Sequence, residues 1–129
     1  VSIDTKKLFF SKYGVYGNNG INKSRYNPID WAKYVVDLGA GEIIINDIDN
    51  DGMMEGYNLN LIKIISESVN IPIVICGGAG KLSDFKLAIN AGAHAVAAGS
   101  MFVYHGPRKA VLVNYPKKNI LNKLFVDNE

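Results

Sequence analysis

Short apolar runs and amphipathic segments alternate along this chain of 129 residues. The runs at residues 42–47, 72–76 and 95–98 are nearly continuous, which is typical of strands in a buried parallel sheet. Residues 1–4 are read as the last residues of another strand, with Asp4 at its carboxyl end. Between the runs, apolar side chains at helical spacing predict three helices and a shorter last one; these begin near Asn27, Asn58, Ser83 and Ile120.

This alternation of strands and helices predicts parallel βα units in an α/β fold. Four units form either a small open sheet or half of a (βα)8 TIM barrel, and the abrupt start at Val1 favours the half-barrel. We expect one domain over residues 1–129, with a hairpin excursion near residues 8–20. A free half-barrel would expose two unpaired sheet edges, so we expect a homo-oligomer that forms through these edges.

Composition and charge narrow the class of protein. The chain is 48% hydrophobic and 20% charged, as globular proteins are, and its formal net charge is only +2. Nucleic-acid binding therefore has little support. The longest apolar runs are far shorter than a membrane span, and the first residues do not resemble a signal peptide. A single cysteine, Cys76, fits a reducing compartment, so we expect a cytoplasmic protein.

A glycine-rich turn follows the strand at residues 72–76. Gly77 and Gly78 would let backbone N–H groups approach a ligand, and a helix that starts directly afterwards favours an anion. The next strand ends at Gly99 and Ser100, and the loops after the last two strands of a barrel commonly form a phosphate site. The sequence therefore predicts one phosphate site shared by the two strand ends.

Acidic residues at the strand ends have two interpretations each. Asp4 could act as a general acid or base at the strand mouth, or it could simply cap the next loop. Asp49 and Asp51 suggest a calcium loop, but the twelfth position counted from Asp47 is Asn58 rather than glutamate. A solvated loop and a backbone contact to phosphate remain the alternatives there. We expect neither a metal nor a cofactor.

Cys76 could be a nucleophile, because its thiol stands at a strand end. The two histidines of the chain, His94 and His105, are predicted on the far side of an element or in a later loop, where neither could activate it. The interpretation as a small, buried strand-end residue is therefore favoured.

Three motifs, in this order along the chain, resemble the cyclase subunit of imidazole glycerol phosphate synthase over about residues 1–104: Gly39-Ala40-Gly41-Glu42-Ile43, Ile48-Asp49-x-Asp51-Gly52 followed by Gly56-Tyr57, and Gly77-Gly78-Ala79-Gly80-Lys81. That family is a (βα)8 barrel of two similar halves, and the resemblance places this chain in the second half, from the fifth strand to the eighth helix. It implies a phosphorylated ribonucleotide substrate and ammonia delivered by a glutaminase subunit, which closes an imidazole ring in histidine biosynthesis.

The resemblance also implies residue roles. Asp4 would be the second of two catalytic aspartates, and Glu42 would lie at the barrel bottom, where ammonia enters. The other catalytic aspartate and a second phosphate site belong to the first half, so this chain alone is expected to be inactive. The remaining implied roles are phosphate binding by Gly77, Gly78, Gly99 and Ser100, supported by Asp51 and Gly52, and lining of the substrate site by Lys6, Asn46 and Cys76.

Some residues depart from the family pattern. Asn46-Asp47 stands where Thr-Ser is usual, Cys76 stands where Ser is usual, and residues 102–116 differ from the usual last helix. These features resemble a paralogue found with surface-sugar genes, which supplies ammonia to an N-acetyl-sugar amidotransferase in surface polysaccharide biosynthesis. A third alternative is a non-catalytic, phosphate-binding half-barrel.

Overall fold

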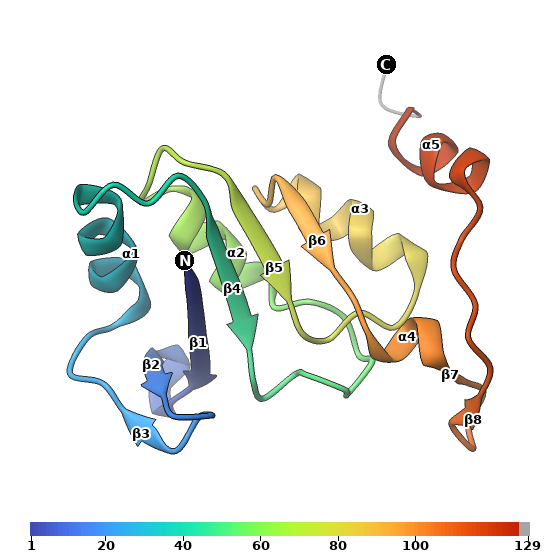
Figure 1. Cartoon of the computed structure of the whole chain (residues 1–129), viewed down its shortest axis with the longest axis horizontal. Coiled ribbons are helices and arrows are strands. Elements are labelled where there is room, and N and C mark those ends of the chain that lie inside the picture. Colours follow the sequence, from blue (N-terminus) through green and yellow to red (C-terminus); the bar gives the residue numbers. More distant parts are fainter. Residues whose placement is uncertain (127–129) are drawn as a thin grey trace.

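The computed structural model describes residues 1–126, and its centre is a six-stranded sheet in the order β3-β2-β1-β4-β5-β6 (Figure 1). Four of the strands are parallel neighbours. These are β1 (Ser2–Lys7), β4 (Ile43–Asp47), β5 (Ile73–Cys76) and β6 (Ala95–Ala97). Successive parallel strands joined by helices confirm the predicted α/β fold of half a (βα)8 barrel.

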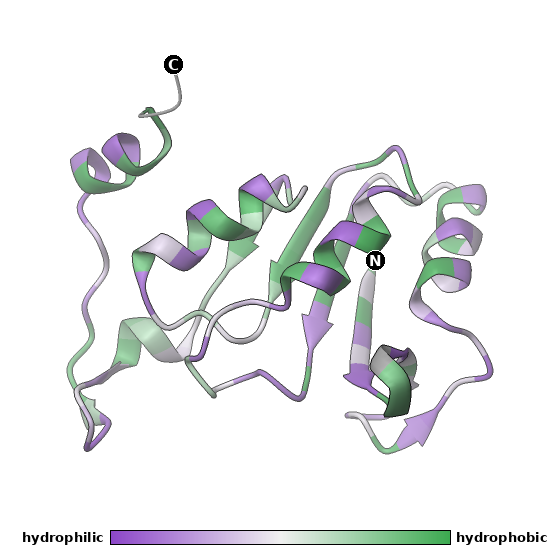
Figure 2. Ribbon diagram, turned by 180° about the vertical axis from the view of Figure 1, so that it is seen from behind, coloured by the Kyte–Doolittle hydropathy of each residue, from purple (hydrophilic) through white to green (hydrophobic). Residues whose placement is uncertain are grey.

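Three helices connect the parallel strands, and the view from behind shows α2 and α3 in front of the sheet (Figure 2). Asn27 and Asn58 cap the first two: their side-chain oxygens accept the N–H groups of Asp30 and Leu61 over 2.9 and 3.1 Å. The predicted helix starts near both asparagines are confirmed. The bounds are α1 (Pro28–Asp37), α2 (Leu59–Ser66) and α3 (Leu82–Asn90).

The core lies between the sheet and these helices. Strand side chains alternate between the two faces, so one set points at the helices and is buried, including Ile3, Ile45 and Ile75 at 1% exposure or less. The other set lies on the face without helices, where Ile44 is 37% exposed. In a complete (βα)8 barrel this second face lines the interior.

Strand β1 does not end at Asp4, as the sequence predicts, but continues to Lys7. The reason is a hairpin: β2 (Tyr13–Gly17) runs antiparallel to the second half of β1, with Asp4 opposite Tyr16. Strand β2 supplies backbone hydrogen bonds to this part of β1, which β1 would lack as a short parallel strand. A 3₁₀ turn, η1 (Phe9–Ser11), joins the two strands, and β3 (Asn22–Lys23) extends the excursion.

The chain after β6 continues as short elements that pack against the same core. They are α4 (Ser100–Val103), a two-stranded ribbon of β7 (Tyr104–His105) and β8 (Ala110–Val111), and α5 (Lys118–Val126), where the last helix is predicted. Helix α5 contacts α3. Within residues 1–126, no helix has both the length and the apolar character needed to cross a membrane.

Candidate functional site

A row of side chains crosses the open face of the sheet near the carboxyl ends of the parallel strands. The register pairs Asp4 with Asn46, Asn46 with Cys76, and Cys76 with Ala97. All four are half-buried and lie on the face opposite the buried isoleucines. The structure therefore brings together three of the predicted site residues, one from each of three strands.

Asp4 is held in place by its neighbour on β4. The Asn46 amide nitrogen Nδ2 donates to the Asp4 carboxylate oxygen Oδ1 over 3.1 Å, and the buried Thr5 hydroxyl donates to the Asn46 carbonyl over 3.2 Å. Lys6 is also half-buried, and its ammonium lies over the Tyr16 ring at 5.0 Å. A carboxylate fixed by a neutral donor keeps its second oxygen available for proton transfer.

The glycines predicted to bind phosphate surround one small pocket at the ends of β5 and β6. It lies beside Cys76 in the row described above. The residues that line it are Asp51, Gly52, Cys76, Gly77, Gly78, Ala79, Ala98, Gly99 and Ser100. Residues as far apart in the sequence as Asp51 and Ser100 thus meet at one place, and every residue to which the sequence assigns phosphate binding is among them.

Two of these glycines are required by the backbone. Gly77 and Gly78 have φ angles of 93° and 109°, which side chains disfavour. A Cβ at Gly77 would lie 2.5 Å from the Asp47 carbonyl oxygen. A Cβ at Gly78 would collide with the Gly56 carbonyl oxygen. The Gly56 N–H also donates to the Gly78 carbonyl over 2.7 Å, so the β5–α3 turn is clamped against the loop after β4.

Three backbone donors among the residues that line this pocket are unpaired. The N–H groups of Gly78, Gly99 and Ser100 donate to no acceptor among residues 1–126, and unpaired amides seek a partner. The Asp51 carboxylate on the rim opposes an anion, but Asp51 is exposed, so water and salt screen its charge. The arrangement leaves these three amides free to donate to a ligand.

Cys76 lines the pocket as a protonated thiol. Burial raises the pKa of Cys76, the Asp51 carboxylate raises it further, and the Gly77 N–H opposes both effects. His94 lies at the other end of β5, where its Nδ1 accepts the Ile73 N–H over 3.3 Å. A thiol without a nearby base is a weak nucleophile, so the structural role of Cys76 is favoured over the catalytic one.

Two aspartates at the carboxyl end of β4 and in the loop after it have structural roles. Asp47 is 1% exposed and faces the helices, where it accepts the amides of Asn50 and Asn58 over 2.8 and 3.1 Å. Burial is the main cause that raises the pKa of Asp47. Asp49 accepts the Lys7 N–H over 2.8 Å. Within the described residues no group of three acidic, histidine or cysteine side chains is placed to hold a metal ion.

Two residues that support the pocket are missed by the sequence analysis. Asp84 is buried, and its Oδ2 accepts the N–H groups of Gly80 and Lys81 over 2.9 and 3.0 Å. The Tyr57 hydroxyl donates to the Ala97 carbonyl over 2.9 Å, and burial raises its pKa. An acidic residue in the first turn of a helix is a recognisable signal for Asp84; the bond of Tyr57 spans 40 positions and has none.

Glu42 lies away from this site. It is exposed at the amino end of β4, and its carbonyl accepts the amino group of Val1 over 2.8 Å. The carboxyl ends of β4, β5 and β6, where the glycine pocket lies, are at the opposite end of the parallel strands (Figure 1). Asp4 is level with Asn46, near that end.

Comparisons with known proteins agree on one family. The sequence model of the family described as "Histidine biosynthesis protein" matches residues 1–108. A provisionally named imidazole glycerol phosphate synthase subunit HisF of Leptospira interrogans is 46% identical over 127 residues, 97% of this chain and 50% of that protein. The HisF subunit of Sulfolobus acidocaldarius is 45% identical over 105 residues, 81% of this chain and 41% of that protein. The chain thus spans about half the length of the curated relatives it matches, or less.

Proposed function

Because the chain belongs to the family of histidine biosynthesis proteins, we propose that it supplies half of the active site of an imidazole glycerol phosphate synthase cyclase. The observation that carries this proposal is the pocket at the ends of β5 and β6, into which all the predicted phosphate-binding residues converge. Asp4 stands in the same row of the open face. A phosphate anchored in the pocket would leave the rest of a substrate over that row.

Phosphate binding would rely on backbone groups. The N–H groups of Gly78, Gly99 and Ser100 would donate to phosphate oxygens, and the Ser100 hydroxyl would add a further donor. The Ser100 hydroxyl lies near Gly52 across the pocket: a Cβ at Gly52 would be 3.8 Å from its oxygen. Asp51 would support the site only by shaping the loop after β4, because its N–H donates to the Asp47 carbonyl over 3.0 Å and its carboxylate repels phosphate.

Asp4 would act as a general acid–base group in ring closure. Its carboxylate is oriented by the Asn46 amide, and the second oxygen can take or return a proton at a substrate atom above the sheet. Lys6 and Cys76 would line the substrate site without entering the chemistry. A protonated Cys76 adds no charge there, which suits its place beside a bound phosphate.

We propose that a glutaminase subunit supplies ammonia from the amino end of the strands, where Glu42 is exposed. This chain carries one catalytic aspartate and one phosphate site, so residues 1–129 alone would form one half-barrel unit without cyclase activity. Its open sheet face and edge strand β6 would drive such a unit to self-associate. We propose a cytoplasmic location, which suits the single free cysteine, Cys76.

A second candidate function is the paralogue that passes ammonia to an N-acetyl-sugar amidotransferase. One observation favours it. Asn46, which departs from the usual residue, contacts Asp4 directly. A non-catalytic, phosphate-binding role is the third candidate.

One assay separates these candidates. The full-length protein is supplied with ammonia and the ribonucleotide substrate of the cyclase, and formation of imidazole glycerol phosphate is followed. The cyclase forms product, and Asp4→Asn reduces its rate strongly. The sugar-modifying paralogue forms none, yet transfers ammonia to an acceptor sugar when its amidotransferase is added. A phosphate-binding protein without either activity supports the third candidate and contradicts the first two.

A further inference from the structure

A cavity of about 550 Å³ lies between the amino end of α3 and the chain that follows β6. It is distinct from the strand-end pocket, although the turn at residues 77–81 borders both: Gly80 faces this cavity, and Gly77 and Gly78 face the other. Its size is within the range of sites for small molecules. Five lining residues (Asn114, Tyr115, Pro116, Lys117 and Ile120) lie beyond the segment that the family model matches.

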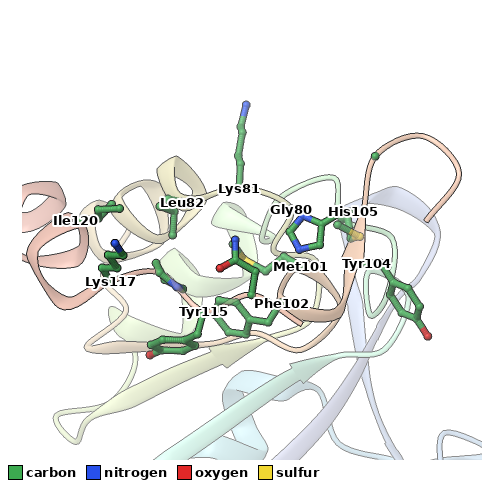
Figure 3. A pocket seen from close by; sticks show the side chains of 14 residues that line it. Gly80, Lys81, Leu82, Met101, Phe102, Tyr104, His105, Tyr115, Lys117 and Ile120 are labelled. Atoms are coloured by element: carbon green, nitrogen blue, oxygen red, sulfur yellow. The ribbon is translucent and has the colours of Figure 1, made fainter. Parts of the chain in front are cut away.

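The walls of this cavity are held by specific contacts. The Asn114 N–H donates to the Phe102 carbonyl over 2.8 Å, and the Leu112 N–H donates to that of Val103 over 2.9 Å. The rings of Phe102 and Tyr115 lie 4.9 Å apart and form an apolar wall (Figure 3). Aromatic pairs at this distance are stabilising, so the tail is attached where it closes the cavity.

The polar part of the lining favours an anion. Lys117 and His105 line the cavity together with the Asn114 amide, and none of the described lining residues is a carboxylate. Lys81, also part of the lining, extends away from the other labelled side chains (Figure 3), so Lys117 is the cation near the aromatic wall. The His105 Nε2 atom is buried and has no hydrogen-bond partner among residues 1–126. An unpaired buried nitrogen is costly, so His105 is the one strained polar group that the lining contains among the described residues.

We propose that this cavity is a second ligand site, which takes a small amphipathic anion: an aromatic or acyl body that carries one sulfonate, carboxylate or phosphate group. The body lies against Phe102 and Tyr115, and the anionic group meets Lys117. The site does not depend on the cyclase proposal, since neither Asp4 nor the strand-end glycines contribute to it.

Anilinonaphthalene sulfonate is a suitable probe, because it combines an aromatic body with one anionic group, and N-phenylnaphthylamine is its neutral analogue. Fluorescence titration of the full-length protein should show saturable binding of the sulfonate, about tenfold tighter than binding of the neutral probe. Lys117→Glu should weaken binding of the sulfonate by about tenfold or more and leave binding of the neutral probe unchanged. Lys118→Glu is the matched control, since Lys118 is the exposed neighbour outside the lining.

A second variant tests the apolar wall. Tyr115 is 67% exposed, and the backbone hydrogen bonds of Leu112 and Asn114 also hold the tail, so Tyr115→Ala should leave the fold intact, as circular dichroism can check. It should weaken the binding of both probes by a similar factor. The proposal is overturned if the sulfonate shows no saturable binding. It is also overturned if Lys117→Glu and Lys118→Glu weaken that binding equally, or if Tyr115→Ala binds both probes as the wild type does.

Discussion

The side-chain amide of Asn46 donates a 3.1 Å hydrogen bond to the carboxylate of Asp4, across the parallel pair of β1 and β4. The two residues are 42 positions apart and meet on the open face of the sheet. This bond sets the direction of the one carboxylate to which we assign proton transfer. It makes Asn46 a positioning residue for Asp4.

Removal of this donor should impair catalysis more than binding. Asn46→Ala loses a hydrogen bond to a charged group, so kcat of ammonia-dependent turnover should fall about tenfold, with KM little changed. Asn46→Thr keeps a donor and is the matched control, expected within about threefold of the wild type. Equal rates for Asn46→Ala and the wild type would show that Asp4 does not need this bond.

The close approach of Gly78 to the Gly56 carbonyl should make the stability of the protein sensitive to a side chain at position 78. Gly78 and Gly39 both have positive φ angles, 109° and 95°, but a Cβ at Gly39 meets nothing within 4 Å, whereas one at Gly78 collides with the Gly56 carbonyl. Gly39→Ala should lower the free energy of unfolding by about 1 kcal/mol, and Gly78→Ala should lower it by about 3 kcal/mol. Urea unfolding measures both; equal losses would mean that the turn is not clamped against the loop after β4.

Burial of Asp47 predicts an unusual pH dependence. Because burial raises the pKa of Asp47 above its ordinary value of 3.8, the folded state binds this proton more tightly than the unfolded state does. The stability contributed by the protonated form is present at low pH and is lost as pH rises through the raised pKa. The free energy of unfolding of the wild type, relative to Asp47→Asn, should therefore increase as pH falls from neutral toward 4. Urea titrations at three pH values check this, and a difference that decreases toward low pH would contradict it.

The protonated state of Cys76 predicts low reactivity. Its pKa is raised above the ordinary 9.0, mainly by burial, so iodoacetamide at neutral pH should modify it at least about tenfold more slowly in the native protein than in urea. Because Cys76 lines the glycine pocket, inorganic phosphate should slow the native reaction further. Mass spectrometry measures both rates. A native rate as fast as the unfolded one would point to an activated thiol.

Local patterns predict the repeating part of this fold and miss the contacts that cross it. Apolar runs and caps such as Asn27 and Asn58 act within a few residues, so they can be read from the sequence. The extension of β1 beyond Asp4 depends on its pairing with β2. The residues of β1 alone do not show how strong this pairing is. Of the adjacent Asn46 and Asp47, only one can face the open side, and the strand register decides which. Asn46 faces the site and Asp47 the helices.

The central claim is that Asp4 performs proton transfer while the glycine pocket holds a substrate phosphate, and a comparison of Asp4→Asn with Gly99→Ala tests it most directly. A Cβ at Gly99 meets no protein atom within 4 Å, so Gly99→Ala should affect only a ligand in the pocket. In ammonia-dependent turnover by the full-length protein, Asp4→Asn should lower kcat by about 10²- to 10⁴-fold with little change in KM. Gly99→Ala should raise KM by about tenfold with kcat nearly unchanged. An unchanged kcat in Asp4→Asn, or an unchanged KM in Gly99→Ala, would contradict the assignment.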